Sequence, residues 1–269
     1  MAPKPTSMIS VKSQTAHCRV VSWHVRRLPV ASLPSLRQDG ITIQGAALPV
    51  AFLKHADEQT IVALAALAGA MEAHGLQETD FTNWAVIAGP RFFGRSAMAF
   101  SLERFAAEGA WGMSPHLIPH RSLHSLSGAV SQALNSHGPN FGVGGGPDAA
   151  AEALAVASAF VMEGKTQGVW LLLTGFDPEL IPWQATADEP CAQDGDCLAI
   201  ALALRPVEQS HNGPVLSVSA RSSFGLTSQF SLEAFAAALN AGLVSRQWRL
   251  GCGGGMAWQV STAGLELCA

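Results

Sequence analysis

A glycine-rich turn separates two very different segments and limits what this chain can fold into. Residues 144–148 read Gly-Gly-Gly-Pro-Asp; they follow a predicted buried strand and precede a helix-favouring segment, 149–163, that ends at Gly164. Asp148 is a good N-cap, because its carboxylate can accept hydrogen bonds from the free amides of the first helical turn. A further apolar run, 169–174, follows. The pattern predicts strand, sharp turn, helix and strand, a common setting for a nucleophile or an anion site.

Apolar segments continue this alternation along the rest of the chain. Helices are predicted at 58–73, with Asp57 as N-cap, at 96–108, at 123–134 and between Ser231 and Gly242, and strands at 19–25, 84–88, 197–204, 215–220 and 256–261. Strands that are apolar throughout and alternate with helices indicate a sheet buried on both faces, so the predicted fold class is α/β. Residues 1–16 are predicted to form a disordered tail, 17–269 one domain, and 177–195 the longest loop.

The composition is apolar and poor in charge. Hydrophobic residues make up 48% of the 269 residues and charged residues only 13%, about half the usual quarter for a soluble chain. Large obligate interfaces are similarly poor in charge, so we expect part of the surface to be covered by a partner. A general bias toward Ala and Gly is the alternative explanation.

Several classes of protein are excluded at this level. The net charge is −4 and no block of Lys and Arg exceeds a pair, which argues against nucleic-acid binding. No apolar run approaches the 18 residues of a membrane span, and residues 1–14 lack the apolar stretch of a signal peptide. Five cysteines without a short repeated spacing indicate free thiols in a reducing compartment. We therefore expect a cytoplasmic protein.

A family resemblance covers the segment around the glycine turn. Residues 114–119 read Ser-Pro-His-Leu-Ile-Pro, Gly128 follows, and residues 138–146 read Gly-Pro-Asn-Phe-Gly-Val-Gly-Gly-Gly. This order resembles the nucleophile region of β-ketoacyl synthases, members of the thiolase-like superfamily. Those enzymes carry Ser-Pro-x-x-x-Pro, an Asn near an Ala-Gly pair, a Gly-Pro, and a small-residue strand ending in Thr-Ala-Cys. Two positions depart: His124 stands where the Asn would be, and Pro147 where the nucleophilic Cys would be.

The resemblance implies a thiolase-like layered sandwich truncated to mainly the N-terminal ketosynthase half, since the Asp-x-His-Gly-Thr motif of the second half is absent. It implies a non-catalytic subunit, similar to chain length factors, that pairs with an active β-ketoacyl synthase in fatty acid, polyketide or polyene biosynthesis. The partner is such a synthase or a second copy, acyl carrier protein is a further candidate, and no cofactor or metal is implied. The residues of the vestigial site or acyl-tunnel wall are Phe141, Gly145, Gly146, Pro147 and Asp148.

Two other patterns have plain explanations. His116, His120 and His124 are spaced four apart, as metal ligands on one helix face would be, but Pro119 is expected to interrupt that helix. We therefore interpret them as structural or surface histidines. Residues 142–146 resemble a phosphate-binding loop, yet they lack the third-glycine spacing and the acidic partner of a nucleotide site.

Two other functions stay open. One is an acyltransferase-type enzyme with a displaced nucleophile, Cys252 in the glycine-rich turn 251–255 or the Asp148 carboxylate. The other is a stand-alone module that binds an acyl group or acyl carrier protein.

Overall fold

The computed structural model describes residues 15–179, 195–208, 213–221, 228–242, 246–251 and 257–263. Its strands are β1 (Thr15–Pro29), β2 (Thr42–Ile43), β3 (Ala46–Ala47), β4 (Trp84–Pro90), β5 (Asn140–Gly142), β6 (Gly168–Asp177), β7 (Asp196–Pro206), β8 (Val215–Arg221), β9 (Ser228–Gln229), β10 (Arg246–Gly251) and β11 (Ala257–Ala263). Its α-helices are α1 (Leu33–Asp39), α2 (Val50–Lys54), α3 (Glu58–Ala73), α4 (Arg95–Glu108), α5 (Leu117–Arg121), α6 (His124–Ala133), α7 (Ala149–Glu163) and α8 (Leu232–Asn240), and short 3-10 helices are η1 (Val30–Ser32) and η2 (Gly109–Gly112).

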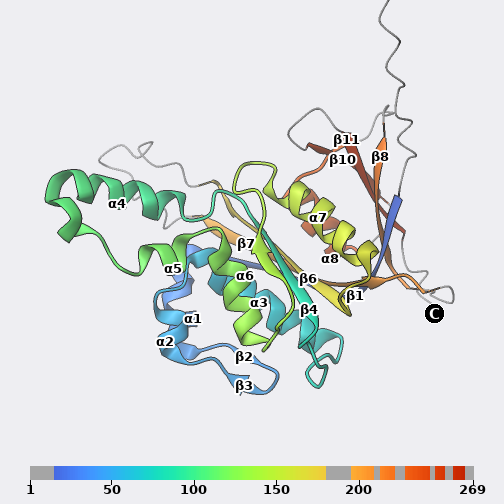
Figure 1. The fold of residues 1–269 in the computed structure, drawn as a ribbon, viewed down its shortest axis with the longest axis horizontal. Helices are drawn as coiled ribbons and strands as arrows, with labels where there is room; N and C mark the ends of the chain where they lie inside the picture. Colours follow the sequence, from blue (N-terminus) through green and yellow to red (C-terminus); the bar gives the residue numbers. More distant parts are fainter. Residues whose placement is uncertain are drawn as a thin grey trace, which may run out of the picture.

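One large mixed sheet organises the fold (Figure 1). Nine strands pair in the order β5-β4-β6-β7-β1-β8-β11-β10-β9, and β2 and β3 form a separate small sheet. β5, β4 and β6 run parallel, whereas β6 to β7, β7 to β1, β1 to β8 and β8 to β11 are antiparallel. The predicted α/β class is therefore correct.

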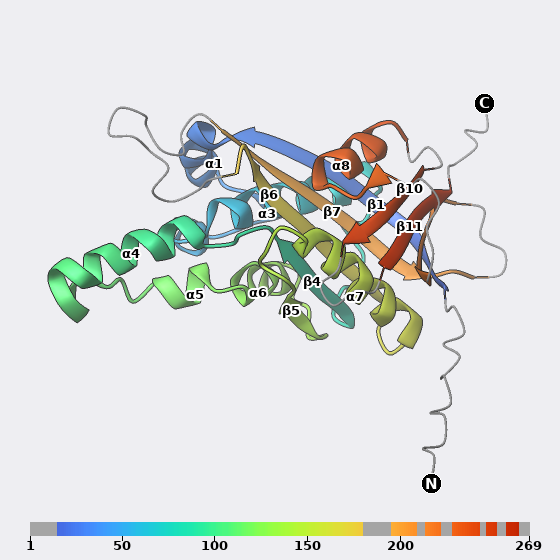
Figure 2. The ribbon, with the colours of Figure 1, turned by 90° about the horizontal axis from the view of Figure 1, so that it is seen from above.

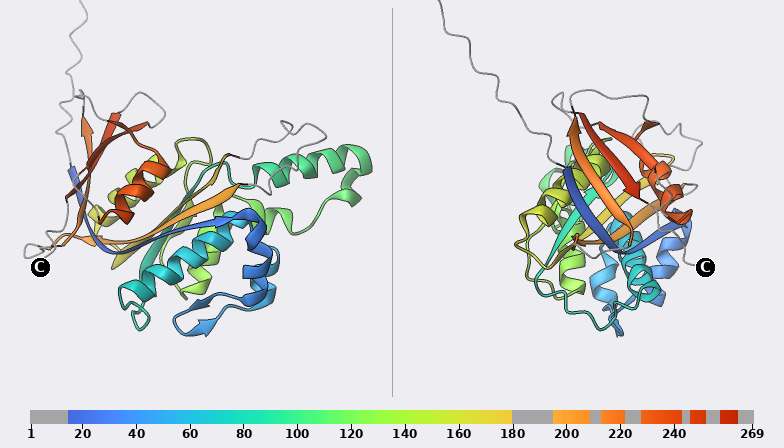
Figure 3. Two further views of the ribbon diagram at one scale, coloured as in Figure 1. Left: turned by 180° about the vertical axis from the view of Figure 1, so that it is seen from behind. Right: turned by 90° about the vertical axis from the view of Figure 1, so that its right-hand side faces the viewer.

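The three central strands β4, β6 and β7 are buried on both faces along nearly their whole length, as the apolar strands predicted. Along β6, Leu171 and Leu173 belong to the core beneath α7, while Trp170 and Leu172 belong to the opposite core beneath α3 and α6. This alternation is the two-residue period of a strand. The antiparallel strands β8, β11 and β10 continue the sheet and turn up beside α7 and α8 (Figures 2 and 3), where Phe235 and Trp248 complete the α7 core.

Most predicted helices and strands are confirmed, and the differences concern mainly where they begin and end. α3 begins after Asp57, whose carboxylate accepts from the Gln59 amide, and α8 begins after Ser231, whose hydroxyl accepts from the Ala234 amide. β1 is far longer than predicted, because its inward side chains alternate with polar outward ones from Thr15 onward. The expected tail is thus wrong for residues 15 and 16, and residues 1–14 and 180–194 lie outside the described part.

Two further differences concern the sheet. The strand before the glycine turn was predicted to be buried, but β5 is a three-residue strand at the sheet edge and is only half-buried. β10 was not predicted, although Gln247 and Arg249 alternate with the buried Trp248 and Leu250, which is the pattern of a strand with one buried face. The edge position of β5 leaves one side of its backbone unpaired within the described residues, which is a template for another chain.

Candidate functional site

The glycine turn lies where the parallel strands β5, β4 and β6 end, the usual place for ligands in open α/β sheets. The Val143 amide donates to the Ala88 carbonyl (2.7 Å), and the Gly145 carbonyl accepts from the Phe92 amide (3.2 Å). Gly144 and Gly145 have φ values of 80° and 95°. A Cβ at Gly144 would stand 2.7 Å from the Ala149 Cα, so this glycine lets the turn close against the first turn of α7.

The start of α7 offers no nucleophile. Residues 138–150 contain no Ser, Thr or Cys, and Pro147 is exposed on the turn. Asp148 occupies the N-cap position, but its side chain makes no capping hydrogen bond, so the predicted carboxylate cap is wrong. Its φ and ψ of −92° and 7° differ from the extended conformation typical of a side-chain cap. The acidic residue in the first turn of α7 is Glu152.

Phe141 has a packing role in this structure. Its ring is half-buried and lies 5.2 Å from the Phe160 ring on α7, centroid to centroid. It therefore joins the edge strand β5 to the helix that follows the turn. Gly145 lies near the Leu123 side chain (3.6 Å from a built Cβ), whereas a Cβ at Gly146 would meet nothing within 4 Å.

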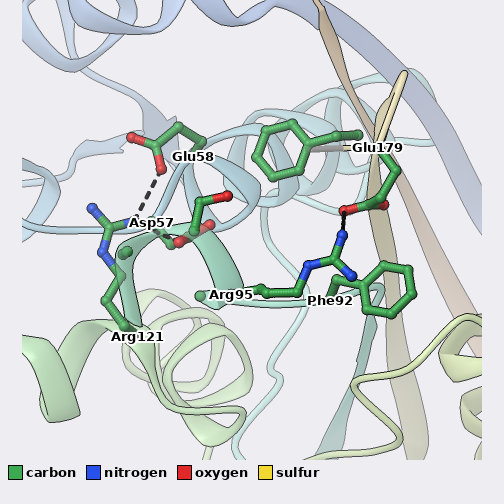
Figure 4. A pocket seen from close by; sticks show the side chains of 10 residues that line it. Asp57, Glu58, Phe92, Arg95, Arg121 and Glu179 are labelled. Carbon is green, nitrogen blue, oxygen red and sulfur yellow. Dashed lines mark hydrogen bonds and ion pairs between the residues drawn. The ribbon is translucent and has the colours of Figure 1, made fainter. Parts of the chain in front are cut away.

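A charged cluster that the sequence did not reveal stands beside the turn, on the other side of Phe92 (Figure 4). Arg121, at the end of α5, donates to Asp57 (2.5 Å) and to Glu58 (2.9 Å) at the start of α3. Arg37 from α1 donates to the other oxygen of Glu58 (2.9 Å). Asp57, Glu58 and Arg121 line a pocket of about 80 Å³ together with Arg95 and Glu179.

Arg91 extends this network across the strand ends. Its guanidinium donates to Glu179 (3.0 Å), to Glu233 on α8 (3.0 Å) and to the Phe176 carbonyl. The Arg91 carbonyl accepts from the Gln59 side chain, whose oxygen accepts from the buried Thr174 hydroxyl (2.6 Å). The carboxylates of this cluster are thus paired with arginines, and the cluster ties α3, α5, β4 and α8 together. Such an arrangement stabilises the ends of the strands.

Burial and the arginines shift the pKa values of the two carboxyls in opposite directions. Burial, reinforced by repulsion from Glu58, raises the pKa of Asp57 from 3.8 to about 6, against the attraction of Arg121. Burial alone would raise the pKa of Glu58 as well, but Arg121 and Arg37 hold that pKa below its ordinary value. Of the two carboxyls that share Arg121, Asp57 therefore takes up the first proton.

The predicted histidine series is split in the structure. His116 precedes α5 and His120 lies on it, with ring centroids 5.9 Å apart, and His116 stacks on His55 at 3.9 Å. Pro119 does not interrupt α5, because it lies in the first helical turn where no intrahelical amide donor is needed. His124 begins the separate helix α6. Within the described residues no group of His, Cys, Asp and Glu side chains could hold a metal ion.

The thiols described by the structure are unreactive. Cys18 and Cys197 are buried and free. Burial raises the pKa of Cys18 to about 11 and that of Cys197 well above its ordinary value. Cys252 lies outside the described residues. No described helix is long and apolar enough to cross a membrane.

Solved structures share this architecture, although neither a family model nor a curated protein matches the chain. One is "Ketosynthase (ApeO) in Complex with its Chain Length Factor (ApeC) from Xenorhabdus doucetiae", at 15% identity and a TM-score of 0.57, covering 91% of this chain and 98% of that chain. The chain has the ketosynthase fold. A second is "The ishigamide ketosynthase/chain length factor", at 16% identity and a TM-score of 0.51, covering 76% of this chain and 67% of that chain.

A third structure shows how much of a larger ketosynthase this chain spans. It is the ketosynthase from module 1 of the bacillaene synthase from Bacillus amyloliquefaciens FZB42, at 13% identity and a TM-score of 0.50. The match covers 79% of this chain and only 47% of that ketosynthase. The chain therefore spans about half of that enzyme, in line with the expected truncation, but nearly the whole of the chain from the Xenorhabdus complex.

Proposed function

We propose that this chain is a non-catalytic, ketosynthase-like subunit that pairs with an active β-ketoacyl synthase in fatty acid, polyketide or polyene biosynthesis. The observation that carries the proposal is the turn before α7, which lies at the strand ends and presents an exposed proline, Pro147, at the position that the resemblance assigns to the nucleophile. Condensation requires a thiolate to hold the acyl chain, and the described thiols, Cys18 and Cys197, are buried.

Two surface properties support pairing. The edge strand β5 has an unpaired side within the described residues, and it lies next to the turn. The chain is also poor in charge, at 13%, as large interfaces are. The solved complexes of ketosynthases with chain length factors have this fold. A partner chain against β5 would place its own catalytic residues close to the glycine turn. Phe141 would then stand beside the acyl tunnel of the pair.

The test is a condensation assay with and without a partner. The purified chain should not condense malonyl and acyl thioesters, whereas its complex with the Cys-bearing ketosynthase encoded beside it should. Replacing the partner's nucleophilic Cys by Ala should abolish synthesis by the complex, which localises the chemistry to the partner. An acyl adduct on this chain alone, lost in Cys252→Ala, would instead identify an enzyme with a displaced nucleophile.

A third result would favour a binding module. If the chain binds acyl carrier protein tightly yet forms no complex with the synthase, the pairing proposal is wrong. Analytical ultracentrifugation at micromolar concentrations gives this answer, since a paired subunit should sediment with the synthase as one species. The pairing proposal is also wrong if the genome encodes no Cys-bearing ketosynthase.

A further inference from the structure

A helical arm projects from the body of the molecule. The arm consists of α4 and η2, residues 95–112, and the ribbon views show it extending well beyond the sheet and its covering helices (Figures 1, 2 and 3). It starts at Gly94, where φ is 67° and a Cβ would lie 2.4 Å from the Arg121 carbonyl oxygen. Only glycine allows the chain to leave the body so close to α5, so the direction of the arm is built into the fold.

The arm carries large apolar side chains in solvent. The exposed fractions are 62% for Phe100, 55% for Leu102, 50% for Phe105 and 99% for Trp111. In α4 only Ala99 is buried. Isolated helices shorter than about 12–15 residues are marginal in water, and most helices depend on burying one face. A 14-residue helix with one buried alanine therefore lacks the packing that ordinarily stabilises it.

The exposed side chains do not share one face of α4. At 100° per residue, Phe100 and Leu102 point about 160° apart. A flat surface can cover only one side of a helix, and a helix that is apolar on several sides is normally enclosed by protein. The arm also carries two Arg and two Glu (Arg95, Arg104, Glu103 and Glu108), without the excess of basic residues found on membrane-surface helices. These properties favour a concave protein surface over a bilayer.

The hollows on the described surface of this chain are partly polar, which makes them a poor fit for a second copy's arm. Apart from Ile118 on α5 beside the arm, the other exposed large hydrophobic side chains are Val50, Met162 and Val207. Val50 begins α2, while Met162 and Val207 share a shallow hollow with His17 and Glu208. Val161 and Pro206 also line this hollow. A second hollow, of about 270 Å³, contains Phe52 and Pro119 but also five polar side chains, those of Thr60, His120, His124, Ser125 and Gln132. Neither is the wholly apolar groove that three aromatic rings would fill.

The apolar area of the arm is large enough to matter for assembly. Aromatic side chains bury 150–250 Å² each, so the four exposed residues offer on the order of 500 Å². Each side of a standard interface contributes about 800 Å². The arm alone would supply more than half of one side, with Trp111 as a central anchor of the kind that dominates binding energy.

We propose that the arm inserts into an apolar groove of the catalytic synthase subunit. This inference rests on the proposed function, because it names the surface by which the two subunits join. Arm and glycine turn are connected through Phe92, whose amide donates to Gly145 and whose ring lies 3.9 Å from the Arg95 guanidinium. The arm therefore leaves the body beside the glycine turn, where strands β4 and β5 end.

The experiment compares two sets of surface substitutions. Phe100→Ser/Phe105→Ser/Trp111→Ser removes the arm's aromatic rings, and Val50→Ser/Met162→Ser removes exposed apolar side chains elsewhere. Binding to the Cys-bearing ketosynthase encoded beside this chain is measured by isothermal titration calorimetry. The arm variant should bind at least about 100-fold more weakly, since hot-spot aromatics each contribute 2 kcal/mol or more, and the control variant should bind within about twofold of wild type.

Circular dichroism should show both variants folded, because every substituted side chain is exposed. Should the triple variant misfold, Trp111→Ser alone serves, together with the Trp111 emission taken as the difference between wild type and Trp111→Phe. That emission should shift to shorter wavelength on adding the synthase.

The outcomes separate this inference from the proposed function. Wild-type affinity in the arm variant overturns the arm inference and leaves the pairing intact. Failure of the wild-type chain to bind the synthase overturns the pairing itself. Self-association of the isolated chain that disappears in the arm variant would identify a second copy as the occupant. Trp111-dependent sedimentation with vesicles of 3:1 phosphatidylcholine and phosphatidylglycerol would identify a bilayer. Either result contradicts the assignment to the synthase.

Discussion

Two helices, α3 and α7, begin near the same edge of the sheet, on opposite faces, and their first turns are built in opposite ways. α3 starts with a buried aspartate that accepts from the Gln59 amide at 2.9 Å and pairs with Arg121. α7 starts with an exposed aspartate that caps nothing, after glycines with positive φ. The first end is held by charges from distant parts of the chain, and the second by backbone conformation alone.

The start of α3 has charged contacts that stabilise the fold, and within the described residues the start of α7 has none of this kind. A helix N-terminus attracts anions through its free amides and its dipole. At α3 that capacity is already used by Asp57 and Glu58. At α7 no described side chain caps the first turn, and its acidic residue there is Glu152. Substitutions at the start of α3 should therefore affect stability more than substitutions at the start of α7.

Removing the shared guanidinium should have the largest effect. Arg121→Met leaves Asp57, whose side chain is 5% exposed, without its ion-pair partner. Loss of one partner of a buried pair costs roughly 3–5 kcal/mol, so the free energy of unfolding measured in urea should fall by about that amount. Arg104→Met, which breaks the exposed pair Arg104–Glu108, is the control and should cost less than about 1 kcal/mol. Equal effects of both substitutions would show that the α3 end is not charge-stabilised.

The pH dependence of stability should report Asp57. Its folded pKa of about 6 lies above the ordinary 3.8, so the folded state binds more protons than the unfolded state between these values. This stabilising contribution is complete below about pH 4 and is lost as pH rises through 6. Asp57→Asn keeps a capping side chain but removes the titration.

The measurement is the unfolding free energy of wild type minus that of Asp57→Asn. It should decrease by roughly 1–3 kcal/mol from pH 4.5 to pH 7 and then stay constant. Urea titrations at intervals of half a pH unit resolve this. A difference that rises with pH would mean that Arg121 outweighs burial at this carboxyl.

Introducing a thiol before α7 should change stability least. Pro147 precedes the N-cap of α7, so the amide introduced by Pro147→Cys needs no intrahelical partner, and stability should change by less than about 0.5 kcal/mol. The thiolate would lie at a helix N-terminus, which lowers its pKa. The variant should therefore gain one rapidly alkylated thiol over wild type, counted by intact mass after iodoacetamide treatment.

The same variant should still not extend an acyl chain. Condensation depends on groups that act as a unit, and a thiolate without its histidines does not complete it. The assay pairs thiol labelling with condensation of malonyl and acyl thioesters. Chain extension by Pro147→Cys alone would mean that suitable histidines stand near the turn and that the chain is a single substitution away from an active synthase.

The charged cluster could not be predicted from the sequence, since its partners lie far apart along the chain. Asp57 and Arg121 are 64 residues apart, and Arg91 and Glu233 are 142 residues apart. The adjacent acids at the start of α3 suggest only a helix cap. His55 and His116 illustrate the same limit. Their rings stack, but His55 follows α2 and His116 precedes α5, and no spacing in the sequence connects the two.

Local patterns were sufficient for the fold class. The apolar strands alternating with helices indicated an α/β sheet, and Gly164 marked the end of α7 because only a few neighbouring residues set a helix boundary. The absence of Ser, Thr and Cys from residues 138–150 is likewise a property of the sequence.

Only the tertiary structure decided which polar and apolar groups are covered. It buried Asp57 against Arg121, left the Asp148 carboxylate without a capping bond, and left Trp111 99% exposed at the end of a projecting helix. Burial depends on what packs against a residue from elsewhere in the chain, and the pattern of its sequence neighbours does not contain that information.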